Sequence, residues 1–82
     1  MSGMISACVL LRTEHGRFDE VTERLKQIKE IRAIFPVHGR YDSVADVEAA
    51  DFDSLGDAVL KINRMAGVVF TETAVEIKRG GQ

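Results

Sequence analysis

The stretch FDEVTERLKQIKEIRAIF, residues 18–35, decides the fold because a similar stretch follows it at an offset of 34 residues. Phe18-Asp19 recurs as Phe52-Asp53. The other equivalent positions are Val21 and Leu55, Leu25 and Val59, Ile28 and Ile62, Ile31 and Met65, and Ile34-Phe35 and Val68-Val69. Apolar residues at this spacing predict an amphipathic helix and then a strand in each half. Two copies are too few for a solenoid, so the duplication predicts a pair of β-α-β units.

Working outward, the periodicity of the whole chain predicts six elements in the order βαββαβ. The expected strands are residues 4–12, 32–38, 42–49 and 68–78, and the expected helices are 17–29 and 52–65. Asp51 is the expected N-cap of the second helix, Arg64 suits its last turn, and Gly67 its C-cap. The prediction is an α+β, ferredoxin-like fold: one antiparallel sheet with both helices on one face. One domain would span residues 1–82, with a core of about 4–78 and a flexible tail at 79–82.

The first predicted strand is apolar on both faces. Ile5, Ala7, Val9 and Leu11 alternate with Met4, Cys8 and Leu10. Two helices can cover only one face of the sheet, and exposed apolar patches of this kind are rare on monomers. We therefore expect a homodimer with its sheets stacked face to face, a dimeric α/β sandwich or barrel.

Several residues are expected to be buried or closely packed in the folded chain. Four phenylalanines look sized to fill it: Phe18, Phe35, Phe52 and Phe70. Cys8 lies in an apolar run and is expected to be a buried thiol. Gly56 interrupts the second helix, and we expect close packing on the sheet to explain it.

Composition excludes several classes of function. A net charge of −2 and a pI near 5.6 argue against direct nucleic-acid binding. A single cysteine excludes an internal disulfide and a multi-cysteine metal site, and no apolar run approaches the ~20 residues of a membrane span. His15 and His38 lack metal-ligand spacing, so we expect no metal site. We also expect no cofactor and no catalytic residue. Without a membrane-spanning run or a signal peptide, we expect no membrane contact and a cytoplasmic location.

The segment HGRYD, residues 38–42, admits two interpretations. Glycine and aspartate are ordinary residues of a hairpin turn. A receptor for a free amino acid needs the same chemistry, because it must hold a carboxylate and an ammonium together. Gly39 can expose backbone N–H groups, Asp42 can accept from an ammonium, and Tyr41 can add an apolar wall with a polar tip. The residues alone leave both interpretations open.

Three segments stand out in order along the chain: ACVLLRTEHGRFDEV, VHGRYDSVADVEA and RMAGVVFTETAVEI. Together they resemble the effector-binding domain of the Lrp/AsnC transcription regulators, also called the RAM domain, and the resemblance covers about residues 5–77. It implies an amino acid effector held at the interfaces between dimers in a ring. It also implies association with full-length regulators of the family. The matching ligand residues are Gly39, Tyr41, Asp42, Thr71 and Thr73, while Arg40 fills a variable position that would tune side-chain preference.

The chain departs from the family pattern at three points. Nothing precedes the first strand, so we expect a stand-alone domain without a helix-turn-helix. Ser43 stands where a bulky apolar residue is usual, and Ala66 where proline is common. Two other functions remain open: a small dimeric α+β barrel enzyme resembling cofactor-free monooxygenases, and a purely architectural oligomeriser.

Overall fold

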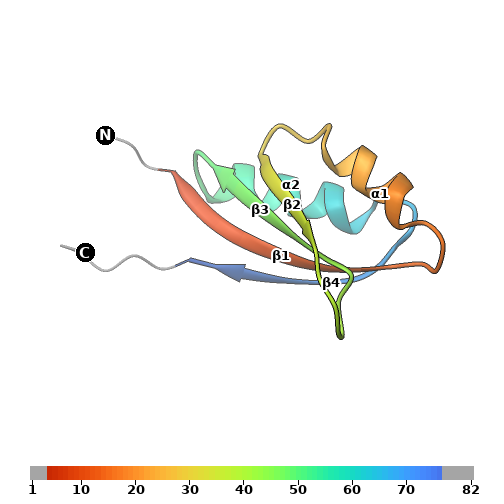
Figure 1. Ribbon diagram of the computed structural model, residues 1–82. Coiled ribbons are helices and arrows are strands. Elements are labelled where there is room, and N and C mark those ends of the chain that lie inside the picture. Colours follow the sequence, from red (N-terminus) through yellow and green to blue (C-terminus); the bar gives the residue numbers. More distant parts are fainter. Residues whose placement is uncertain (1–3, 77–82) are drawn as a thin grey trace.

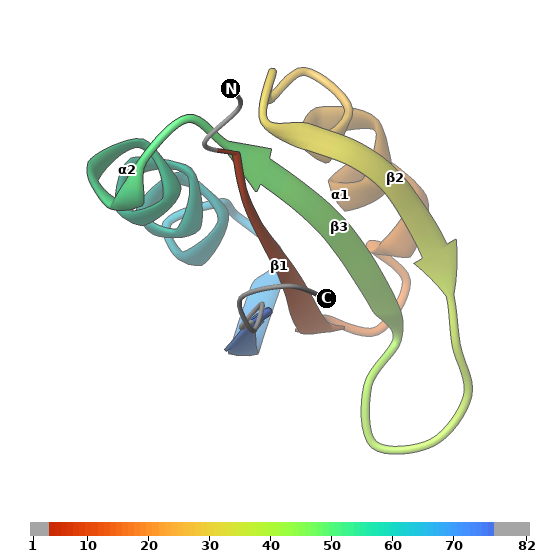
Figure 2. The same ribbon diagram turned by 90° about the vertical axis from the view of Figure 1, so that its left-hand side faces the viewer.

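The computed structural model describes residues 4–76 and contains four strands and two helices in the predicted order. The elements are β1 (Ile5–Thr13), α1 (Phe18–Leu25), β2 (Ile31–Pro36), β3 (Ser43–Ala49), α2 (Phe52–Asn63) and β4 (Val68–Val75). The strands form one antiparallel sheet in the order β2-β3-β1-β4. Both helices lie on the same face of this sheet, and the other face is open (Figures 1 and 2). The predicted fold class is confirmed.

The core lies between the helices and the sheet. Val9 and Leu11 of β1 meet Leu25 of α1 and Ile62 of α2, and all four are fully buried. The rest of the core consists of larger side chains and four alanines: Val21, Ile28, Val47, Leu55, Ala7, Ala45, Ala49 and Ala58. The side chains that alternate with the buried residues of β1 point to the open face, as the period of two in a strand requires.

The phenylalanines do not fill this core. Phe35, Phe52 and Phe70 are 50%, 67% and 53% exposed, and Phe18 is half-buried. Phe35 and Phe70 lie at strand positions that face away from the helices, since their register partners are Val44 and Arg12. The prediction is wrong for these three because it used side-chain size alone: Phe35 and Phe70 fall on the uncovered face of the sheet by strand alternation, and Phe52 lies at the exposed start of α2.

Two smaller predictions about the core also fail. Cys8 is exposed on the open face, where its thiol donates to Asp46 Oδ1 at 3.6 Å. Residual burial, and then this hydrogen bond, raise the pKa of the Cys8 thiol. Gly56 is exposed on α2, and a Cβ built there would meet no atom within 4 Å. Close packing on the sheet therefore does not explain the glycine.

The helix ends differ in how well the sequence predicts them. The Asp51 carboxylate accepts from Ser54 N at 2.8 Å and caps α2, as predicted. Arg64 forms the C-cap, and Gly67 lies beyond it with a φ of 96°. α1 ends at Leu25, short of the predicted residue 29. The chain then tightens into turns with i to i−3 hydrogen bonds, such as Ile28 N to Leu25 O at 3.0 Å, and enters β2.

Strand ends shift by a few residues. β1 runs one residue past the predicted end, with a register shift between Arg12 and Thr13. β2 ends at Pro36 and β3 starts at Ser43, so the segment between them is a loop of residues 37–42. We call it the β2–β3 loop. β4 is described to Val75; the predicted strand end at 77–78 and the tail at 79–82 lie outside the described residues.

Candidate functional site

Asp42 fastens the base of the β2–β3 loop to the end of β1. Its Oδ2 accepts from the backbone N–H of Thr13 at 2.6 Å and from the Thr13 hydroxyl at 3.1 Å. Its own N–H donates to Leu11 O at 2.8 Å, and its carbonyl accepts from Val37 N at 2.9 Å. The side chain is half-buried. Asp42 is therefore a structural anchor as well as a candidate ligand residue.

Tyr41 fastens the same loop to β4. Its ring stacks on Phe70 with centroids 6.1 Å apart and planes 13° apart. Its hydroxyl donates to the carboxylate of Glu72, and this bond, more than burial or the Glu72 charge, raises the pKa of Tyr41. Phe70 and Glu72 lie two residues apart, on the open face of the sheet. The loop thus reaches past the end of β1 to the edge strand.

The tip of the loop, just before these two anchors, is exposed. Gly39 has a φ of 115°, which favours glycine, and a Cβ built there would meet no atom within 4 Å. Arg40 and His38 are exposed beside it. Ser43, directly after the loop, is 1% exposed and faces the core. The tip extends away from the sheet in Figure 2.

Thr71 and Thr73 lie on the other face of β4. Their register partners are Leu11 and Val9, which are buried under the helices. Both threonines are half-buried, and the Thr71 hydroxyl donates to the side-chain carbonyl of Asn63 at the end of α2. They share one face of the strand, as predicted. That face is opposite the one that Tyr41 contacts.

One chain therefore brings together only part of the predicted site. Residues 39–42 form one cluster, and the two threonines form another across the thickness of β4. Sequence reasoning missed the residues that hold the loop: Thr13, Phe70 and Glu72. Alternation along β4 puts Phe70 and Glu72 on the face opposite the threonines, but only tertiary contacts bring these two residues to Tyr41.

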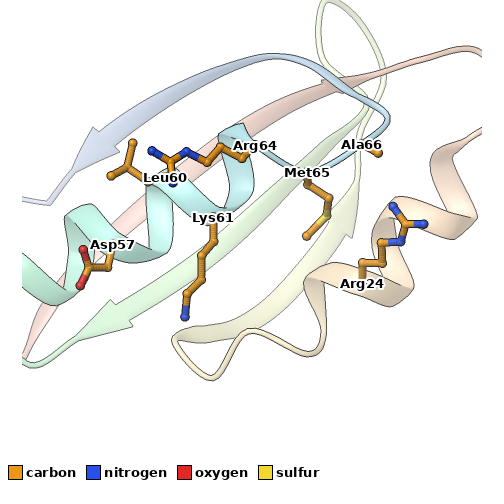
Figure 3. A pocket seen from close by; sticks show the side chains of 7 residues that line it. All are labelled: Arg24, Asp57, Leu60, Lys61, Arg64, Met65 and Ala66. Carbon is orange, nitrogen blue, oxygen red and sulfur yellow. The ribbon is translucent and has the colours of Figure 1, made fainter.

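The described part of the chain also has a groove on its outer side, between α1 and α2 (Figure 3). It has a volume of about 520 Å³ and is open to solvent. Its lining residues are Arg24, Asp57, Leu60, Lys61, Arg64, Met65 and Ala66. The lining includes no residue of the β2–β3 loop and neither threonine.

Other chemistry has little support among the described residues. Within residues 4–76, no three histidine, cysteine, aspartate or glutamate side chains form a group that suits a metal ion. His15 and His38 are both exposed, and the space between helices and sheet is filled by the fully buried core residues. No helix in this part of the chain is long and apolar enough to cross a membrane.

Comparison with known proteins gives the family. Residues 6–80 match the model of the Lrp/AsnC ligand-binding domain. The chain belongs to this family. It is 26% identical over 74 residues to the HTH-type transcriptional regulator FL11 of Pyrococcus furiosus, a match that covers 90% of this chain and 49% of the regulator. This Lrp/AsnC domain thus spans about half the length of that curated relative.

Solved structures share the fold of the domain. TTHA0845 from Thermus thermophilus superposes with a TM-score of 0.86 at 30% identity, covering 95% of this chain and 99% of that one. The transcriptional regulator NMB0573 from Neisseria meningitidis, solved as a complex with L-Met, superposes with a TM-score of 0.83. Its identity is 14%, with 95% of this chain and 53% of that chain covered, so this likeness concerns the fold alone.

Proposed function

We propose that this Lrp/AsnC ligand-binding domain senses a free amino acid and acts in regulation rather than catalysis. The observation that carries the proposal is the β2–β3 loop, fixed at its base by Asp42 and Tyr41 and exposed at its tip. Backbone N–H groups beside Gly39 suit the ligand carboxylate. Thr13 occupies Oδ2 of Asp42, which leaves Oδ1 for the ligand ammonium.

The effector would lie between two chains. The loop contacts one face of β4, and the two threonines point from the other face. A site that uses both would therefore need the loop of one chain and the threonines of another. Arg40, exposed at the loop tip, would contact the side chain of the amino acid. The arrangement favours a ring of dimers, alone or with full-length regulators of the family, as the sensing form.

The first contact between copies would be the open sheet face. Phe35 and Phe70 are half exposed there, and Leu10 and Val44 lie between them on β1 and β3. A second copy stacked face to face would remove this apolar surface from water. The enzyme alternative has no comparable support, because it requires a roomy cavity facing a histidine between the helices and the sheet.

Calorimetric titration with each of the twenty amino acids tests the proposal. It should be run at protein concentrations where light scattering shows an assembly. We expect one amino acid, or a few of similar shape, to bind at fixed stoichiometry to the chains. An intact assembly that binds none of them would instead identify an architectural oligomeriser.

A further inference from the structure

Asn63 is the last residue of α2, and its side chain reaches β4. The Thr71 hydroxyl donates its proton to the side-chain carbonyl of Asn63. Asn63 is exposed and Thr71 is half-buried. Because water can reach this region, the bond replaces a bond to water and adds little to stability. What the bond does fix is the direction of the Thr71 hydroxyl.

This bond decides which kind of group Thr71 can bind. A free hydroxyl has one donor and two acceptor positions, and it can turn to suit either a carboxylate or an ammonium. Here Asn63 takes the single proton. The Thr71 oxygen is left with acceptor positions only, so its next partner must be an N–H or O–H donor. A carboxylate would first have to displace Asn63.

The end of α2 favours a positively charged donor at the same place. The last backbone carbonyls of a helix form the negative end of its dipole, which stabilises a nearby cation. The Thr71 hydroxyl is bonded to the residue that ends this twelve-residue helix, so it lies at the negative end. The basic side chains there, Lys61 and Arg64, line the outer groove between α1 and α2 instead (Figure 3).

β4 presents Thr71 at an edge of the sheet. In the strand order β2-β3-β1-β4, the neighbour of β4 is β1. The Glu76 N–H donates to Ser6 O of β1 at 2.8 Å, and backbone groups along an antiparallel strand point alternately to its two sides. Counting back from Glu76, the backbone groups of Thr73 and Thr71 point to the outer side. A ligand can therefore approach Thr71 without disrupting the sheet.

We propose that Asn63 is a positioning residue of the effector site, which holds the Thr71 hydroxyl so that its oxygen accepts from the ammonium of the amino acid. The inference rests on the proposed function. An ammonium has three N–H donors, so Asp42 of one chain and Thr71 of another can bind it together. The carboxylate then lies at the loop, beside the backbone N–H groups next to Gly39. Asn63 thus makes the strand half of the site select a positively charged nitrogen over a carboxylate.

Two substitutions of Asn63 test this role by calorimetric titration with the twenty amino acids. Asn63→Leu has a similar size but no acceptor, so the Thr71 hydroxyl is free to turn. We expect affinity to fall about three- to tenfold. Asn63→Asp still accepts the Thr71 proton and adds a negative charge, so it should bind at least as tightly as the wild type. If Asn63→Leu binds like the wild type, or Asn63→Asp binds no tighter than Asn63→Leu, the proposal is overturned.

A double variant tests whether Asn63 acts through Thr71. Thr71→Val should lower affinity about tenfold or more, because it removes an acceptor for a charged group. Asn63→Leu added to Thr71→Val should change affinity by less than about twofold, since no hydroxyl remains to be positioned. A further loss as large as that of Asn63→Leu alone would show that Asn63 acts independently of Thr71, and would reject the positioning role.

Lys61→Leu is the matched control, since it also replaces an exposed polar residue in the last turn of α2 with leucine. Lys61 points away from β4 in Figure 3, so affinity should stay within about twofold of the wild type. Circular dichroism and light scattering should show every variant folded and assembled like the wild type. A wild type that binds no amino acid overturns the proposed function together with this inference. A wild type that binds, with Asn63 variants unchanged, overturns this inference alone.

Discussion

At the scale of single residues, Asp42 decides whether the β2–β3 loop is only a turn. Its Oδ2 already holds two hydrogen bonds from Thr13, so truncation to alanine would remove an anchor as well as a charge. Asp42→Asn separates the two roles, because the amide oxygen can still accept from Thr13. We expect unfolding free energy to change by about 1 kcal/mol or less and amino acid affinity to fall at least about 30-fold.

Asp19→Asn is the control for this measurement, since Asp19 is an exposed carboxylate on α1. It should leave calorimetric affinity unchanged. Wild-type affinity in Asp42→Asn would show that the carboxylate serves the loop and not a ligand.

Tyr41 makes a pH dependence at the same loop testable. The hydrogen bond to Glu72 raises the pKa of Tyr41 above its ordinary value of 10.0. Because the folded-state pKa is the higher one, the stabilisation is fully present below pH 10.0 and is lost as pH rises through the folded pKa. We expect the wild type to melt above Tyr41→Phe at neutral pH and this difference to shrink in alkaline solution. A difference that stays constant to about pH 11 would contradict the assignment.

At the scale of elements, Gly39 and Gly67 both have a positive φ, but only at Gly67 would an added Cβ collide with a neighbour. Alanine variants of the two can therefore distinguish the cost of backbone strain from the cost of a steric clash. Gly67 connects α2 to β4 with a φ of 96°, and a Cβ there would lie 2.7 Å from Val21 Cγ2. Gly39 has a φ of 115° with nothing within 4 Å. In denaturant unfolding we expect Gly67→Ala to cost about 2–4 kcal/mol and Gly39→Ala about 1–2 kcal/mol. Equal costs would mean that Val21 moves aside freely.

The elements also show what sequence can predict. The helical repeat after Phe18 and Phe52 and the two-faced first strand follow from local periodicity, and the structure has both. The end of α1 does not follow, because Ile28 keeps its core position in a turn as well as in a helix. Phe35 and Phe70 lie on the open face because strand residues alternate between the two faces, and side-chain size does not tell which face the helices cover.

At the scale of the whole molecule, the open sheet face should control the first step of assembly. Leu10→Asp places a charge on β1 in the middle of that face. We expect the dimer dissociation constant to rise at least about 30-fold while the domain stays folded, as measured by light scattering and circular dichroism. Gln27→Asp, on the exposed side of the turn after α1, should leave the dimer intact. A dimer unaffected by Leu10→Asp would place the interface elsewhere.

Whole-molecule geometry also limits what sequence could say about the site. The loop residues and the threonines were assigned together by resemblance, and the alternation of β4 then puts them on opposite faces. Thr13, Phe70 and Glu72 entered the site only through tertiary contacts, across separations of 29 residues for Thr13 with Asp42 and 31 for Tyr41 with Glu72. When two chains each contribute residues to a binding site, the spacing of those residues along one sequence does not show that they meet.

The most direct measurement is a titration of mixed chains with the amino acid that the wild type prefers. Asp42→Asn alters only the loop, and Thr73→Val alters only β4. If the effector lies between chains, each variant alone should bind at least about 30-fold more weakly than the wild type. Their co-refolded equal mixture should regain about a quarter of the wild-type sites, those with an intact loop from one chain and an intact strand from the other. A mixture that regains none, or a wild type that binds no amino acid, would contradict the account.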